Sequence, residues 1–92
     1  MHVLLVPQYN PGKEIIYEFK GELITATIDG ITDVFDFSTM PDGVADQIDT
    51  ILPLNPVLSA KKVNGVLFVE LLNFIDEDAT EEERFPDWQV IE

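Results

Sequence analysis

The stretch EIIYEFKGELITATIDGITDVFDF, residues 14–37, contains two tight-turn signals that specify one and the same strand pairing. Gly21-Glu22 suits a type II′ turn and Asp29-Gly30 a type I′ turn, because glycine and aspartate tolerate the positive φ values that these turns need. Counting outward from either turn places the same apolar side chains on one face of a three-stranded meander. That face holds Ile15, Tyr17, Phe19, Ile24, Ala26, Ile28, Ile31 and Phe35. Since the period of two agrees across three strands, register and burial are specified together.

A second hairpin is predicted over VLSAKKVNGVLFVELLNF, residues 57–74, around the turn dipeptide Asn64-Gly65. Pairing about this turn sets Val63 opposite Val66 and predicts one face that must be buried. The residues predicted for that face are Leu58, Ala60, Leu67, Val69 and Leu71. The other face carries Ser59, Lys61, Phe68 and Glu70, and its mixed character makes Phe68 a candidate for a second contact surface.

Two further elements complete the first 75 residues. HVLLV, residues 2–6, is predicted to form the first strand, ended by Pro7. STMPDGVADQIDTILP, residues 38–53, changes period, because its apolar residues recur at helical spacing. These residues are Val44, Ile48, Ile51 and Leu52. We therefore expect a short helix here, capped by Thr39 or Asp42 and stopped by Pro53.

The C-terminal segment, residues 76–92, carries eight of the eighteen acidic residues together with Phe85 and Trp88. Asp78 and Thr80 each precede a glutamate by three residues, which is the spacing of a capping box, so TEEERF can start a single helical turn that Pro86 ends. DWQVI then alternates weakly and could form a short last strand. The aromatic residues favour an ordered segment that packs on the domain. A partner-binding peptide and a disordered acidic tail are the alternatives.

The predicted fold class is mainly β, with α+β as the alternative. We expect a small antiparallel β-sandwich or partly open barrel of about six strands, with one short helix between the meander and the second hairpin. The β-rich domain would span residues 1–75. The acidic segment, residues 76–92, would pack against it.

The residue inventory argues against an enzyme. The chain has 92 residues, no cysteine, two serines and a single histidine, His2, which we expect to be a plain strand residue. A catalytic triad needs a base beside its nucleophile. A calcium loop starting at Asp76 would need glycine where Glu81 stands. We therefore predict no catalytic residue, no cofactor-binding residue and no metal ligand.

Charge and hydropathy limit the surroundings in which the chain can work. The net charge of −13 repels nucleic acid and anionic lipid. No apolar run approaches the length of a membrane span, and the N-terminus lacks the basic and apolar regions of a signal peptide. We expect a protein that is cytoplasmic when made, with the virion as a further location.

Four segments, LLVPQYNPGK, DGITDVFDFSTMPDG, NGVLFVELLNFI and ATEEERFPDW, resemble small uncharacterised proteins of bacteriophages and prophages of Gram-positive bacteria. The resemblance implies a virion component, an assembly accessory or a host-directed protein, and it assigns no residue a role. Together with the inventory it predicts a non-catalytic structural or protein-interaction module. The expected partner is a phage structural protein or a second copy. Phe68, Phe85 and Trp88 are the candidate partner-binding residues.

The alternative function is an acidic mimic of nucleic acid that binds and inhibits a DNA- or RNA-binding protein of the host. Such a mimic needs carboxylates spaced like phosphates on one face. Its binding would fall steeply with salt, because contacts between exposed charges are screened.

Overall fold

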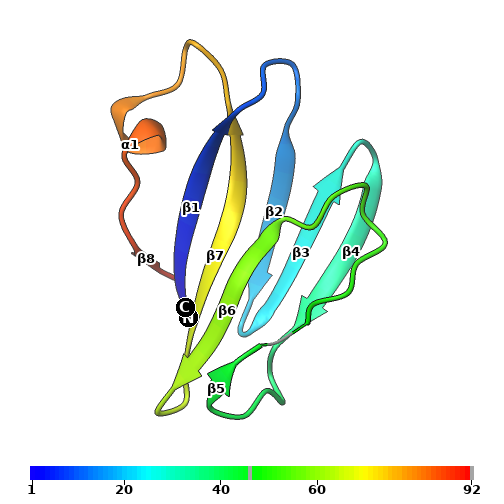
Figure 1. Cartoon of the computed structure of the whole chain (residues 1–92), viewed down its shortest axis with the longest axis vertical. Helices are drawn as coiled ribbons and strands as arrows, with labels where there is room; N and C mark the ends of the chain where they lie inside the picture. The colour runs from blue at the N-terminus through cyan, green and yellow to red at the C-terminus, as the bar shows by residue number, and fades with distance from the viewer. Residues whose placement is uncertain (46, 92) are drawn as a thin grey trace.

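The computed structural model describes residues 1–45 and 47–91, so Asp46 of the expected helix and Glu92 of the acidic segment lie outside the described residues. The described residues form eight strands in two sheets and one short helix (Figure 1). The mainly β fold class is confirmed, with eight strands where about six were expected. The elements are β1 His2–Tyr9, β2 Ile15–Lys20, β3 Leu23–Ile28, β4 Ile31–Asp36, β5 Gly43–Val44, β6 Val57–Val63, β7 Val66–Ile75, α1 Glu81–Arg84 and β8 Gln89–Val90.

The three-stranded sheet, β2-β3-β4, has the register that the two turns predict. Ile24 lies between Phe19 on β2 and Phe35 on β4. The turn at Asp29 and Gly30 has φ values of 51° and 78°, as a type I′ turn requires. All but one of the apolar residues assigned to the inner face are buried or half-buried. The exception is Ile31, which is 43% exposed because it lies at the start of the edge strand, beside the turn.

The five-stranded sheet has the order β5-β6-β7-β1-β8 and contains a parallel pair that the sequence analysis did not predict. β1 and β7 run parallel over eight residue pairs, from His2 opposite Phe68 to Tyr9 opposite Ile75. β1 also continues through Pro7, which was expected to end it. Only His2 and Val3 pair with β8, so most of β1 has a ladder on one side only, where proline is tolerated.

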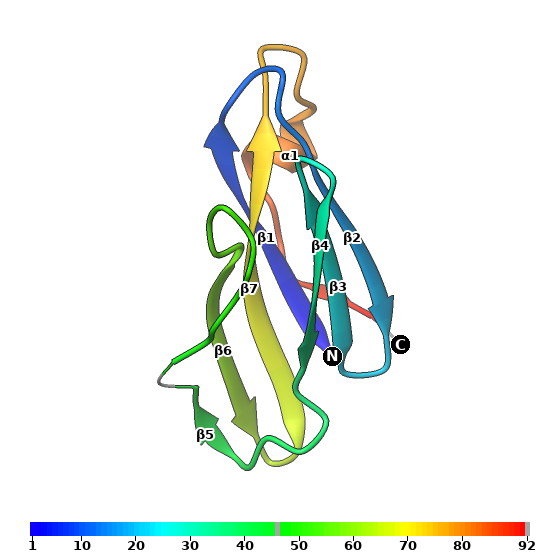
Figure 2. The ribbon, with the colours of Figure 1, turned by 90° about the vertical axis from the view of Figure 1, so that its right-hand side faces the viewer.

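The two sheets pack face to face and enclose the core (Figure 2). Ile24, Ala26 and Phe35 come from the small sheet. Val69 and Leu71 come from the centre of the large one, and all five side chains are almost completely buried. In the described part of the chain no strand pairing joins the two sheets, so the sandwich is not closed into a barrel.

A β-bulge shifts the register of the second hairpin at Leu58. Val57 pairs with Leu71 and Ser59 pairs with Glu70, which leaves Leu58 as the extra residue between them. Val57 is therefore buried, whereas Leu58 is 48% exposed. The prediction that Leu58 lies on the buried face was wrong, because counting from a turn assumes an uninterrupted ladder.

The helix expected between the meander and the second hairpin was also wrong. The described residues of that segment, 38–45 and 47–53, form β5 and irregular turns. Gly43 has a φ of 128°, a value that a helix does not accommodate. The segment runs along the side of the molecule between β4 and β6, where Leu52 is buried against the core (Figure 1).

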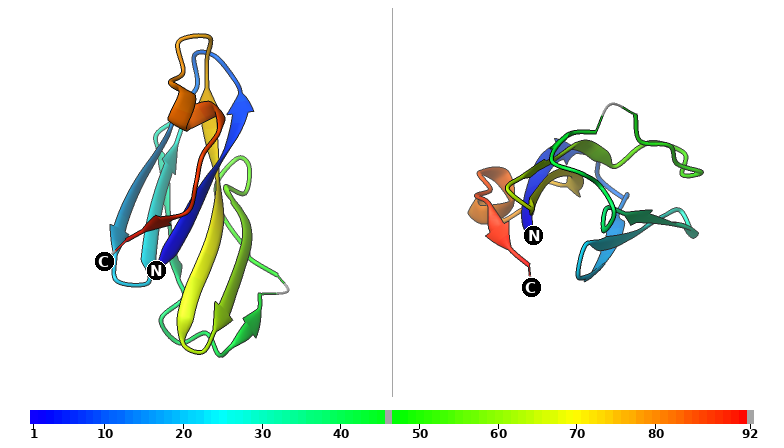
Figure 3. Two further views of the ribbon diagram at one scale, coloured as in Figure 1. Left: turned by 90° about the vertical axis from the view of Figure 1, so that its left-hand side faces the viewer. Right: turned by 90° about the horizontal axis from the view of Figure 1, so that it is seen from below.

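The C-terminal segment runs beside β1 and ends as the edge strand of the large sheet (Figure 3). α1 is the single turn that the sequence predicts. Thr80 Oγ1 accepts a hydrogen bond from the N–H of Glu83, and the Glu83 carboxylate accepts one from the N–H of Thr80. The chain ends meet, because the amino group of Met1 donates to Ile91 O at 3.0 Å and Ile91 N donates to Met1 O at 2.8 Å.

Candidate functional site

The outer face of the five-stranded sheet carries one continuous row of side chains across all five strands. Directly paired residues in a sheet point to the same face. The pairings run from Val44 to Lys61, from Lys61 to Phe68, from Phe68 to His2 and from His2 to Val90. Phe68, which the sequence assigned to the mixed face of its hairpin, stands at the middle of this row.

Phe68 is the centre of an aromatic cluster. The His2 ring stacks on Phe68 with centroids 4.7 Å apart and an interplanar angle of 11°. The Trp88 ring meets the Phe68 ring edge-on at 5.8 Å. Lys61 Nζ lies 5.8 Å from the centre of the Phe68 ring, within the range of a cation–π contact. Side chains from three other segments of the chain thus meet at Phe68.

Aliphatic side chains surround this cluster and remain open to solvent. Val44 is 69% exposed and Val90 is 63% exposed, at the two ends of the row. Val63 and Val66, which pair beside the Asn64-Gly65 turn, are also exposed. We call this surface the outer-face patch. It comprises His2, Val44, Lys61, Val63, Val66, Phe68, Trp88 and Val90.

The three residues proposed from the sequence for partner binding do not lie together. Phe68 and Trp88 contact each other, and Trp88 is 41% exposed. Phe85, at the end of α1, is 76% exposed and takes part in none of the aromatic pairs found among the described residues. The outer-face patch therefore includes two of the three candidates and leaves Phe85 outside.

Sequence reasoning missed His2, which it assigned to an ordinary strand. His2 does lie on β1, but its place beside Phe68 follows from the parallel pairing of β1 with β7. No local signal encodes that pairing, because its two strands stand more than sixty residues apart. The exposed pair Val63 and Val66 could have been predicted from the sequence, because the Asn64-Gly65 turn sets these two residues opposite each other on the same face as Phe68.

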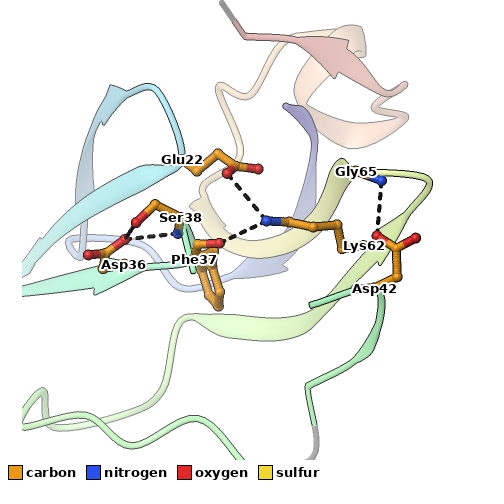
Figure 4. A network of polar contacts seen from close by, with 7 residues as sticks. All are labelled: Glu22, Asp36, Phe37, Ser38, Asp42, Lys62 and Gly65. Carbon is orange, nitrogen blue, oxygen red and sulfur yellow. Dashed lines mark hydrogen bonds and ion pairs between the residues drawn. The ribbon is translucent and has the colours of Figure 1, made fainter. Parts of the chain in front are cut away.

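A buried lysine joins the two sheets on the inner side of β6. Lys62 is 7% exposed, and its Nζ donates to Glu22 Oε1 at 3.3 Å and to the carbonyl oxygen of Phe37 at 3.1 Å (Figure 4). Glu22 belongs to the β2–β3 turn and Phe37 follows β4. The same view shows the hydrogen bond that Asp42 accepts from the N–H of Gly65. Asp42 also accepts a hydrogen bond from the N–H of Asn64. These contacts fix turns and sheets to one another.

Among the described residues, three groups have shifted pKa values, and each shift has a structural explanation. Asp33 accepts hydrogen bonds from the hydroxyl of Thr50 and from the N–H of Ile51, which lower its pKa. Hydrogen bonds from the hydroxyl and N–H of Ser38 lower the pKa of Asp36. Burial raises the pKa of Tyr17, whose hydroxyl donates to the carbonyl oxygen of Leu72. These groups hold the fold together and do not converge on a common cleft.

The described residues line at least two open depressions on the surface. One depression, of about 210 Å³, lies between the loop after β1 and the loop after β7. It is lined mainly by polar groups, among them Lys13 and Glu83. The other, of about 300 Å³, lies between β4 and the segment that follows β5. Neither lining contains a serine or histidine that could form a nucleophile–base pair. Among the described residues, no three metal-binding side chains come together.

Within the described ranges, no helix is long and apolar enough to cross a membrane. Comparisons with protein-family models, with curated proteins and with solved structures found no match.

Proposed function

We propose that this chain is a non-catalytic protein-interaction module, that the outer-face patch is its docking surface, and that it serves a bacteriophage particle or its assembly. The observation that supports docking is the exposure of an aromatic and aliphatic surface on a chain with a net charge of −13. Large contiguous apolar patches are uncommon on the surfaces of monomeric proteins and often mark binding sites. The phage context rests on the sequence resemblance alone.

The composition of the patch supports binding to protein. Tryptophan is the residue most enriched at the energetic centre of protein interfaces. Trp88 and Phe68 contact each other within the patch, Val44 and Val90 lie at the two ends of its row, and Val63 and Val66 lie beside the hairpin turn. An aromatic centre with a rim that excludes water is the arrangement in which a few side chains supply most of the binding energy.

The test is capture of a partner from a lysate of a Gram-positive host in which a prophage has been induced. The bait is the full chain, beside Phe68→Ala and Trp88→Ala. A control variant, Val34→Ala, removes an exposed apolar side chain from the outer face of the other sheet. Circular dichroism checks that every variant is folded. A truncation after Ile75 is unsuitable as a test, because it would remove β8 from the sheet.

We expect the native chain and Val34→Ala to retain a partner through a high-salt wash, and the two aromatic variants to lose it. Equal retention by all four baits would refute docking through the patch. A nucleic-acid-binding partner that salt releases from every bait alike would instead support the acidic mimic, the second candidate function that the net charge favours.

A further inference from the structure

We infer that the outer-face patch binds a second copy of this chain in a two-fold homodimer. This inference rests on the proposed function, because it names the partner of the same surface. The first argument is electrostatic. The chain has eighteen acidic and five basic residues, so most of its surface repels another copy.

The few basic side chains are mostly occupied elsewhere. Lys13 pairs with Asp29, Lys62 is buried, and Arg84 donates to the carbonyl oxygens of Glu77 and Ala79. Lys61 is the basic residue that lies on the outer face, one strand away from Glu70 of β7. The patch and its immediate neighbour Glu70 are therefore close to neutral, and two acidic copies can approach each other there without opposing like charges.

The second argument is geometric. Lys61 lies one strand to the side of Phe68, about 5 Å away, and Glu70 lies two residues along β7, about 7 Å away. Consider a dimer whose two-fold axis passes between the two Phe68 rings, parallel to the sheets and midway between these two directions. The strands of the two copies then cross at about 90°, and the direction from Phe68 to Lys61 in one copy coincides with the direction from Phe68 to Glu70 in the other. Such orthogonal packing is one of the two usual ways in which sheets stack. Each Lys61 then faces Glu70 of the other copy, with the two Phe68 rings between them.

The contact of Glu70 with its neighbour on β6 supports this pairing. Ser59 Oγ donates to Glu70 Oε2 at 2.7 Å, which holds the carboxylate on the outer face. Five strands about 4.8 Å apart span about 20 Å, and a square of that width covers about 400 Å² on each copy, which is less than the roughly 800 Å² per partner of a standard interface. We therefore expect a weak dimer that forms and dissociates with concentration.

Analytical ultracentrifugation of the purified full chain over a wide concentration range tests the inference. The native chain and the control Val34→Ala should move from the mass of one chain toward the mass of two as concentration rises. Phe68→Ala, Lys61→Glu and Glu70→Lys should remain single chains. The double variant Lys61→Glu/Glu70→Lys should dimerise again, because it exchanges the two charges and restores the cross-pairing.

The charge variants separate a specific contact from general repulsion. Glu70→Lys makes the chain less acidic, so loss of the dimer in this variant cannot come from added negative charge. A native chain that stays single at every concentration, or a dimer that persists in Phe68→Ala and in both single charge variants, would overturn the inference. A single chain that still captures a different protein through Phe68 and Trp88 would leave the proposed function standing, whereas a chain that does neither would remove both.

Discussion

Neighbouring lysines on β6 have opposite surroundings, because successive side chains of a strand point to opposite faces. Lys61 is exposed beside Phe68, whereas Lys62 is buried between the sheets. A buried ammonium group is costly unless its charge and its donors are satisfied. Glu22 supplies the charge and Phe37 supplies a carbonyl oxygen, so the cost is offset by contacts that tie β6 to the β2–β3 turn and to the residue that follows β4.

This difference predicts unequal effects of two alanine substitutions. Lys62→Ala removes a buried side chain and leaves Glu22 and the Phe37 carbonyl without their donor, so we expect the free energy of unfolding to fall by about 2–4 kcal/mol. The exposed control Lys61→Ala should cost less than about 1 kcal/mol. Urea denaturation of the three proteins measures both values. Equal losses for the two variants would contradict the inner position of Lys62.

Asp33 predicts a dependence of stability on pH. Because hydrogen bonds from Thr50 and Ile51 lower its pKa below the ordinary 3.8, the folded state favours the ionised carboxylate. The contribution of Asp33 to stability is present above pH 3.8 and is lost as the pH falls through the lowered pKa. Thermal unfolding at pH 6 should therefore separate the native chain from Asp33→Asn, and the gap should narrow toward pH 3. A gap of constant size would exclude this linkage.

At the scale of elements, the parts that could be predicted from the sequence are those in which local signals agree. The meander register followed from two turns and one alternating pattern, and the turn of α1 followed from Thr80 and Glu83. The expected helix around Val44 failed because Gly43 has a positive φ and the segment is too short to be stable as a helix without strong packing. Of the four apolar residues with this spacing, Leu52 is buried and Ile48 is half-buried, whereas Val44 and Ile51 are exposed, so the spacing does not mark one buried face.

The sequence predicted only part of the candidate site, because local signals determine only part of it. Phe68 could be assigned to the solvent face of its hairpin, because the Asn64-Gly65 turn fixes the alternation. The contacts of Phe68 with His2 and Trp88 depend on pairings of β1 with β7 and β8, which join the two ends of the chain. Such long-range pairing is decided by the packing of the whole core and leaves no local pattern.

The bulge in β6 gives a prediction at this scale. Val57 is 5% exposed and its neighbour Leu58 is 48% exposed, although counting from the turn predicts the reverse. We expect Val57→Ala to lower the free energy of unfolding by about 2 kcal/mol, because it opens a cavity in the core. Leu58→Ala, which removes more atoms, should cost less than about 1 kcal/mol. Chemical denaturation of both variants decides between the two registers, and a larger loss at Leu58 would support an uninterrupted ladder.

The whole molecule combines a small, well-packed core with a strongly charged exterior. The acidic segment contributes β8 to the edge of the large sheet (Figure 3). It also brings Trp88 against Phe68 on the outer face, and three of its acids, Glu81, Glu82 and Glu83, lie in the first turn of α1. The segment is thus part of the sheet and supplies part of the patch. Its carboxylates add to the negative charge that repels another acidic chain. Electrostatic repulsion therefore opposes apolar contact least at the outer-face patch.

This charge distribution predicts that salt stabilises the fold. Among the described residues the structure has two ion pairs, Lys13–Asp29 and Lys62–Glu22, against a net charge of −13. Repulsion between carboxylates opposes the compact state, and at about 0.1 M salt it is screened beyond about 10 Å. The midpoint of thermal unfolding at pH 7 should therefore rise as sodium chloride is added. Near the pI of about 4.1 the net charge vanishes, and the same addition should have little effect. A midpoint that falls with salt at pH 7 would mean that the two ion pairs outweigh the repulsion of the whole surface.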